Sequence, residues 1–221
     1  MICAAIRRLR GDRDGGVMVE MTVLLPIFLV FVLGGAEFLF IFYQWNAAAK
    51  SVEVGARIAA VSDPVANGLK TLSVNVVNNT TVYEGDPMPA FTVTCNGPSN
   101  PNQCSCAGAG CANAVSYNLS AMQKIVYGRA AGTSCNTSSS YYFAGMCNFR
   151  SGLAPSNVQV VYSQTGLGYA GREDGPKPTV TVSLRAVTVQ YFFLSWLLGA
   201  STTLPSFTTT ITGEVLSAAA Q

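Results

Sequence analysis

The stretch that decides the fold is residues 21–43, which read MTVLLPIFLVFVLGGAEFLFIFY and contain one charged residue, Glu37. An α-helix rises about 1.5 Å per residue, so a helix of this length covers about 35 Å and can cross a bilayer. A cleaved secretory signal fits less well, because its apolar region holds only about 7–15 residues before a small-residue cleavage site. The stretch therefore predicts a single membrane-spanning anchor helix.

The segment that follows the span continues the helical pattern. Residues 44–60, QWNAAAKSVEVGARIAA, place small or apolar side chains on one helix face, at Ala48, Val52, Ala56 and Ala59. Lys50 and Arg57 lie three and four residues from Glu53, a spacing that favours ion pairs on an exposed helix face. Pro64 ends the pattern, because the residue before a proline disfavours the α conformation. We expect one helix of roughly 40 residues, half in lipid and half outside it.

Three residues in or beside the apolar run need an explanation: Glu20, which directly precedes it, and Pro26 and Glu37 within it. A carboxylate at the edge of a membrane segment is costly, so Glu20 either lies at the water interface or gains a partner. Glu37 lies toward the other end of the run, where it either extends to water or contacts a partner helix. A helix turns about 100° per residue, so the two glutamates point to different faces and do not share a site. Pro26 is expected to kink the helix.

Charge is concentrated before the apolar run. Residues 1–15 contain four arginines and two aspartates, which together account for the whole formal net charge of +2. Basic residues flanking a span favour the cytoplasmic side, so we expect the amino terminus in the cytoplasm. The remainder of the chain has no excess of positive charge, which argues against nucleic acid as a partner.

Six of the seven cysteines lie within residues 95–147. They are Cys95, Cys104, Cys106, Cys111, Cys135 and Cys147, and the seventh is Cys3. An even number in the exported part predicts up to three disulfides formed in an oxidising compartment, with the pairing left open. The spacing is not typical of a zinc site, so no metal and no cofactor is predicted.

Catalytic chemistry has little support in the sequence. The chain contains no histidine, which removes the commonest general base and the Ser-His and Cys-His nucleophile pairs. An exported thiol-disulfide enzyme using Cys104 and Cys106 is an alternative. However, no lysine or arginine lies within ten residues of the pair to lower a thiol pKa. We expect a protein that is not an enzyme.

The remainder of the chain predicts a β-rich head. Strands are expected at the alternating stretches 72–77, 91–95, 157–163, 178–190 and 211–216, and a short helix at 119–130. Residues 96–116 predict a loop held by disulfides. The apolar residues 191–200 are too short to span a membrane, which favours a core segment over a buried partner surface.

These elements predict an α+β fold in which an antiparallel sheet packs on the outer half of the long amino-terminal helix. Three regions are expected. Residues 1–15 form a cytoplasmic leader that is cleaved, 16–62 form the transmembrane and extended helix, and 63–221 form the disulfide-stapled extracytoplasmic domain.

The order of short motifs in residues 7–60 is informative. A basic stretch is followed by Gly15 with Glu20 five residues on, by Leu25–Pro26, by Glu37, and by Gly55–Ala56–Arg57. In this order the motifs resemble the TadE-like proteins of tight-adherence pilus systems.

The resemblance implies a minor pilin or pseudopilin of a Flp-type, type IV-like pilus, acting in initiation, assembly or surface adhesion. It implies cleavage between Gly15 and Gly16 by a prepilin peptidase. The new amino group at Gly16 of a neighbouring subunit would then neutralise Glu20 and set the register of subunit addition. The implied partners are other pilin and pseudopilin subunits, the inner-membrane assembly platform and membrane lipid. The expected location is the inner membrane, with a single pass, the head extracytoplasmic, and incorporation into a surface pilus.

One further alternative comes from a different functional class. A membrane-anchored periplasmic binding or envelope protein would have the same span and head, but it would not need cleavage at Gly15 or entry into a pilus.

Overall fold

The computed structural model describes residues 13–79, 81–97, 103–111, 116–128, 132–135, 143–173, 175–189, 191, 193 and 202–213. The chain divides into two compact units. The anchor unit comprises residues 1–43 and 189–202, and the head unit comprises residues 44–188 and 203–221. Each unit is described by itself below.

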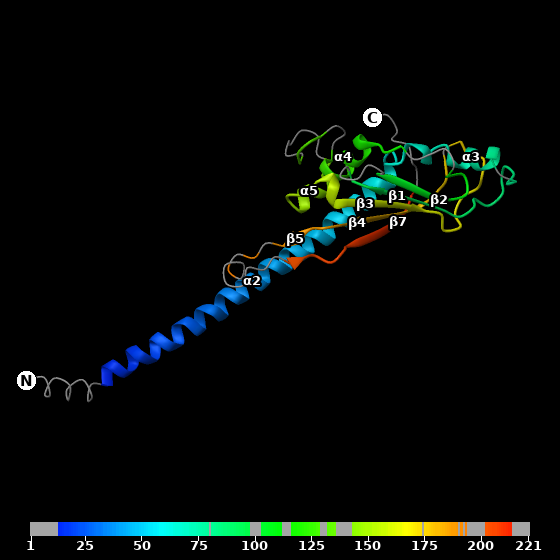
Figure 1. Cartoon of the computed structure of the whole chain (residues 1–221). Coiled ribbons are helices and arrows are strands. Elements are labelled where there is room, and N and C mark those ends of the chain that lie inside the picture. Colours follow the sequence, from blue (N-terminus) through cyan, green and yellow to red (C-terminus); the bar gives the residue numbers. More distant parts are fainter. Residues whose placement is uncertain are drawn as a thin grey trace, which may run out of the picture. The chain divides into compact units, whose positions relative to one another are not determined.

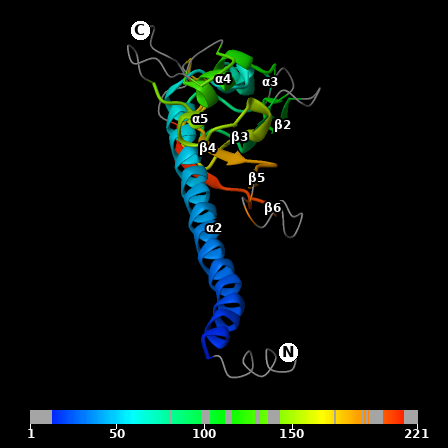
Figure 2. The same ribbon diagram turned by 90° about the vertical axis from the view of Figure 1, so that its left-hand side faces the viewer.

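One long helix, α2, runs from Arg13 to Val61 and passes through Pro26 without interruption (Figures 1 and 2). Its 49 residues exceed the predicted length, because it begins before the glycine pair and ends at Val61, just before Pro64. The part in the head unit buries the predicted face of small and apolar residues, Ala48, Val52, Ala56 and Ala59. Both predicted ion pairs of Glu53 are present, with Lys50 at 2.9 Å and with Arg57 at 2.5 Å.

The head contains a five-stranded antiparallel sheet with the order β2-β1-β3-β4-β7 (Figure 1). The strands are β1 (Phe91–Asn96), β2 (Cys104–Gly108), β3 (Val158–Ser163), β4 (Thr179–Leu184) and β7 (Thr208–Thr212). In β1 and β3 buried residues alternate with more exposed ones, as expected when one face of a sheet packs on a core. The predicted strands at 91–95 and 157–163 are confirmed.

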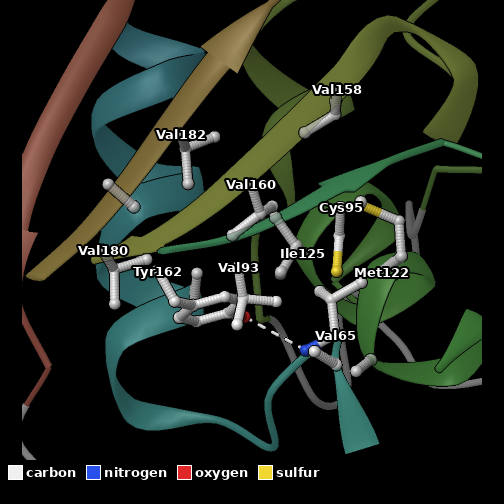
Figure 3. Packing of buried hydrophobic residues seen from close by; sticks show 14 of the residues in the cluster. Val65, Val93, Cys95, Met122, Ile125, Val158, Val160, Tyr162, Val180 and Val182 are labelled. Atoms are coloured by element: carbon white, nitrogen blue, oxygen red, sulfur yellow. Dashed lines mark hydrogen bonds between the residues drawn. The ribbon is translucent and has the colours of Figure 1, made fainter. Parts of the chain in front are cut away.

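The core of the head lies against one face of this sheet. One buried cluster contains Met122, Ile125 and five residues from three neighbouring strands, Val93, Val160, Tyr162, Val180 and Val182 (Figure 3). Met122 and Ile125 belong to α4 (Leu119–Tyr127), which confirms the predicted short helix. Asn118 caps this helix by accepting a hydrogen bond from the backbone N–H of Ala121 at 3.1 Å. The buried face of α2 belongs to the same cluster, so the predicted packing of an antiparallel sheet on the helix is confirmed.

Residues 72–77 are not a strand. They lie in the helix α3 (Leu72–Asn79), which follows the short 3-10 helix η1 (Asn67–Leu69). Leu72 and Val76, four residues apart, are both buried in the core. The alternation of Leu, Val and Val with polar residues favoured a strand, but packing of one helical face against the core decides the structure.

The predicted loop at 96–116 contains the strand β2, which pairs with β1 so that Cys95 lies opposite Cys104. These two cysteines are joined by a disulfide, and the other pairs are Cys106 with Cys111 and Cys135 with Cys147. Cys147 belongs to the short helix α5 (Met146–Phe149). Each disulfide closes a short loop, since the paired residues are 9, 5 and 12 positions apart.

The predicted strand at 178–190 is two strands. β4 ends at Leu184, and β5 (Thr188–Val189) pairs with β6 (Thr202–Thr203) in a separate two-stranded sheet. Between β4 and β5, Ala186 has a φ of 52°, a left-handed conformation that ends the extended backbone. The strand predicted at 211–216 corresponds to β7, which begins earlier and shares only residues 211 and 212 with the prediction. Residues 214–216 lie outside the described part of the chain.

These elements form a mixed α+β fold. It consists of a long apolar amino-terminal helix and a head with an antiparallel sheet and three disulfides. The predicted fold class is confirmed. The 3-10 helix η3 (Pro155–Asn157) completes the described elements of the head.

Candidate assembly site on the amino-terminal helix

The predicted cleavage point lies in the first turn of α2, where Gly15 and Gly16 are both helical. A methyl group added at Gly16 would meet nothing within 4 Å, so its surroundings are open. Glu20 follows Gly16 by one helical turn, an axial rise of about 6 Å. The glycine pair and the carboxylate therefore occupy one short stretch of a single helix.

Glu20 is exposed in this chain. It takes part in no ion pair with any other residue in the described ranges. Large apolar side chains surround it along the helix, and Val17, Met18, Val19 and Met21 are all more than half exposed. The carboxylate thus lies on an apolar surface without an ion-pair partner among the described residues.

α2 carries a surface suited to lipid. Among the described residues it is one helix that is long and apolar enough to cross a membrane. Its exposed large side chains run from Val17 to Phe31 and beyond, and they include Leu24, Leu25, Ile27 and Phe28. An amino-terminal apolar helix of this kind fits a single-pass membrane anchor.

Pro26 lies within this surface. A proline has no backbone N–H to donate to the carbonyl one turn earlier, at Thr22. The hydroxyl of Thr22 in turn donates to the carbonyl oxygen of Met18 at 2.6 Å. The proline therefore removes one backbone hydrogen bond and the threonine adds a side-chain bond in the preceding turn, while α2 continues through both.

Glu37 is buried, with 2% of its surface exposed. Its Oε2 accepts a hydrogen bond from the backbone N–H of Phe193 at 2.8 Å, a residue 156 positions away in the sequence. Both residues belong to the anchor unit. The sequence did not indicate this bond to a distant segment of the same chain.

The Gly55–Ala56–Arg57 motif lies on the part of α2 that packs into the head. A methyl group at Gly55 would lie 2.5 Å from Sδ of Met146, so glycine is what lets α2 approach α5 closely here. Ala56 is fully buried and Arg57 reaches out to Glu53. The hydrogen bond from Lys50, with the nearby charge of Arg57, lowers the pKa of the Glu53 carboxyl.

The cysteines form no metal centre within the described ranges, and no cluster of three potential ligands is found there. Cys104 and Cys106 are bonded to different partners, Cys95 and Cys111, and not to each other. The pairing therefore uses all six cysteines of residues 95–147 as structural links within the head.

Residues 15–57 match the family model for TadE-like proteins. The resemblance inferred from the short motifs is confirmed over these residues, which make up the TadE-like segment. No curated protein and no solved structure matches the chain.

The TadE-like segment coincides with the site described above. It begins at Gly15, ends at Arg57, and so contains Glu20, Pro26, Glu37 and the close contact at Gly55. It supports a protein associated with the tight-adherence pilus and interacting with other pilus components.

Sequence reasoning located these residues but missed two of their contacts. The bond from Phe193 to Glu37 joins residues too distant for any periodicity to connect. The contact of Gly55 with Met146 had one signal, a glycine inside an alanine-rich helix, where it lowers helix stability and so indicates close packing.

Proposed function

We propose that this protein is a minor pilin or pseudopilin of a tight-adherence, Flp-type pilus system. It is a structural subunit and not an enzyme, and it serves pilus initiation, assembly or surface attachment. The observation that supports the proposal is the TadE-like match over residues 15–57. Within this range Gly15, Glu20 and Glu37 follow one another along one apolar helix.

Processing is the first step of this role. A prepilin peptidase acting on the cytoplasmic side cuts between Gly15 and Gly16, which removes the arginine-rich leader. A peptide bond inside a helix must leave the helical conformation before it can be cut. Glycine destabilises a helix by about 1 kcal/mol relative to alanine, so a glycine pair in the first turn makes this unwinding easier.

Pairing of Glu20 is the second step. Cleavage makes Gly16 the amino terminus of α2, and Glu20 then lies one turn from it. The helix dipole offers the carboxylate some stabilisation there, typically about 0.3–1 kcal/mol. The larger contribution comes from the ammonium group of a neighbouring subunit's Gly16, since a carboxylate in low dielectric needs a close opposite charge. This contact sets the axial register between subunits.

The partners follow from these two steps. The protein meets the prepilin peptidase, other pilin and pseudopilin subunits, the inner-membrane assembly platform and membrane lipid. The basic leader supports a cytoplasmic amino terminus, and the disulfides support an extracytoplasmic head in an oxidising compartment.

The test follows the amino terminus of the chain and its entry into pili. Mass spectrometry of protein from sheared pili is expected to find a chain that begins at Gly16. The Glu20→Leu variant is expected to insert and be cleaved normally, yet its amount in the pilus fraction should fall at least about tenfold, the effect of losing roughly 1.4 kcal/mol. Glu20→Asp should retain part of the incorporation.

Glu53→Gln is the matched control, because Glu53 lies on the same helix and is bonded to Lys50 and Arg57 in its own chain. It is expected to enter pili at the wild-type level. An uncut chain in assembled pili would contradict the pseudopilin role and favour a membrane-anchored envelope protein. Normal incorporation of Glu20→Leu would contradict the pairing alone.

A further inference from the structure

The contact between Glu37 and Phe193 has a consequence for the membrane. The backbone N–H of Phe193 donates to Oε2 of Glu37 at 2.8 Å, and Glu37 is 2% exposed. The side chain of Phe193 is 48% exposed. A large apolar ring is therefore held at the surface of the anchor unit by a hydrogen bond from its own backbone.

The depth of this contact follows from its place on α2. Glu37 lies six residues before Tyr43, an axial distance of about 9 Å. The helix surface between them is apolar, since Phe38, Leu39, Phe42 and Tyr43 are each more than half exposed. Phe193 is thus attached below the level at which the apolar surface of the span ends.

Burial in an apolar setting makes the bond valuable to both partners. A backbone N–H outside a helix must find an acceptor at membrane depth, because lipid offers none. A carboxylate taken out of water must likewise be hydrogen-bonded. Glu37 gives the N–H of Phe193 an acceptor and gains one donor in return, whereas a leucine at position 37 would leave that N–H without this acceptor.

The sequence around Phe193 suits the same environment. β5 ends at Val189 and its partner β6 begins at Thr202, so Phe193 lies between the two strands in the sequence. Residues 190–201 read QYFFLSWLLGAS and contain no charged residue. Aromatic residues such as Tyr191 are enriched where a bilayer meets water.

We propose that Phe193 is a second lipid contact of this protein, inserted into the bilayer beside the Tyr43 end of the span. The ring of Phe193 lies at the boundary between the lipid headgroups and the acyl chains. Glu37 is the positioning residue, since it holds the backbone of Phe193 against α2 and does not itself face lipid. The inference goes beyond the pilus role, because it requires a bilayer around α2 and no polymer.

The test measures the surroundings of position 193 in the full chain. A nitroxide spin label is attached to Phe193→Cys in a Cys3→Ser background, and the protein is placed in phosphatidylcholine and phosphatidylglycerol vesicles. The substitution keeps the backbone N–H that bonds to Glu37. Collisions of the label with oxygen, which concentrates in lipid, and with a water-soluble nickel chelate are then compared by electron paramagnetic resonance.

Two positions calibrate the result. Phe38→Cys reports the lipid-facing surface of α2, and Tyr83→Cys reports an exposed site in the head. We expect the ratio of oxygen to nickel collisions at position 193 to match position 38 and to exceed position 83 at least several-fold. A ratio like that of position 83 overturns the proposal. Protection from both reagents also overturns it, because it would place position 193 against a second copy of the chain.

Variants of Glu37 test the positioning role. Glu37→Gln keeps an acceptor oxygen and should leave the ratio at position 193 unchanged. Glu37→Leu removes the acceptor and should raise nickel collisions at position 193 several-fold, while those at position 38 stay constant. An unchanged ratio in Glu37→Leu overturns the role of Glu37. No pilus is needed for these measurements, so their failure is distinct from failure of the pilin proposal.

Discussion

Tyr162 is the largest fully buried side chain among the described residues. Its hydroxyl oxygen accepts a hydrogen bond from the backbone N–H of Val65 at 3.0 Å, as Figure 3 shows. Burial raises the pKa of the Tyr162 hydroxyl far above its usual value of 10, although the bond from Val65 opposes the shift. Tyr117 offers a contrast, since its buried hydroxyl has no hydrogen-bond partner in the described ranges and burial raises its pKa to about 12.

These two tyrosines predict opposite effects of removing a hydroxyl. Tyr162→Phe leaves the N–H of Val65 buried without a partner, so it should lower the free energy of unfolding of the head by about 1–3 kcal/mol. Tyr117→Phe removes a hydroxyl that is already unpaired, so it should be neutral or stabilising. Urea unfolding followed by tryptophan fluorescence measures both, since Trp45, one of the two tryptophans, contacts Phe207 edge-on in the head. Equal losses in the two variants would contradict this reasoning.

The raised pKa of Tyr162 also predicts how the stability of the head changes with pH. Above pH 10 an unfolded tyrosine loses its proton, whereas the folded Tyr162 keeps it, so the folded state binds more protons. Stability from this group is full below pH 10 and falls as the pH rises toward the folded pKa. Tyr162→Phe should therefore flatten the decline in stability between pH 10 and 11 relative to the wild type.

At the scale of elements, the packing of α2 on α5 depends on Gly55. An alanine there would overlap Met146, and overpacking of this kind costs about 1–3 kcal/mol. Alanine also favours a helix by about 1 kcal/mol over glycine, which offsets part of the loss. We expect Gly55→Ala to lower the free energy of unfolding by about 1 kcal/mol, by urea unfolding of the full chain.

A double-mutant cycle isolates the contact. Met146 is fully buried, so Met146→Ala alone should cost about 2–5 kcal/mol. In that background the overlap is gone, and Gly55→Ala should become stabilising through helix propensity. The same effect of Gly55→Ala in both backgrounds would mean that the two residues do not interact.

Element by element, the sequence was most informative where one pattern acted alone. The apolar run and the small residues at helical spacing predicted α2, and alternation predicted β1 and β3. Alternation failed for α3, where β-branched residues lie on a helix because its buried face meets the core. It also could not show the break after β4, because nothing marks Ala186 as a residue that adopts a positive φ.

For the whole molecule, the predictable part of the site is the part carried by a single helix. Gly15, Glu20 and Glu37 were found from their order along the chain, and residues 15–57 match the TadE-like model. The disulfide pairing depends on how the head folds, and the bond from Phe193 joins two segments of the anchor unit that are 156 positions apart, so spacing left both open. Long-range contacts of this kind are fixed by packing and not by local pattern.

The orientation of the whole chain can be tested with its own cysteines. All six cysteines of residues 95–147 are paired, so the leader residue Cys3 is left as the thiol that a maleimide can modify. The basic leader predicts that this thiol faces the cytoplasm. In a host without the prepilin peptidase, a membrane-impermeant maleimide should label the chain in inverted vesicles and not in right-side-out vesicles. Reductant should then expose the head cysteines in right-side-out vesicles, while Cys3→Ser should abolish labelling before reduction. Labelling of Cys3 in right-side-out vesicles would contradict the predicted orientation. The Gly15–Gly16 bond would then be out of reach of a peptidase that acts on the cytoplasmic side.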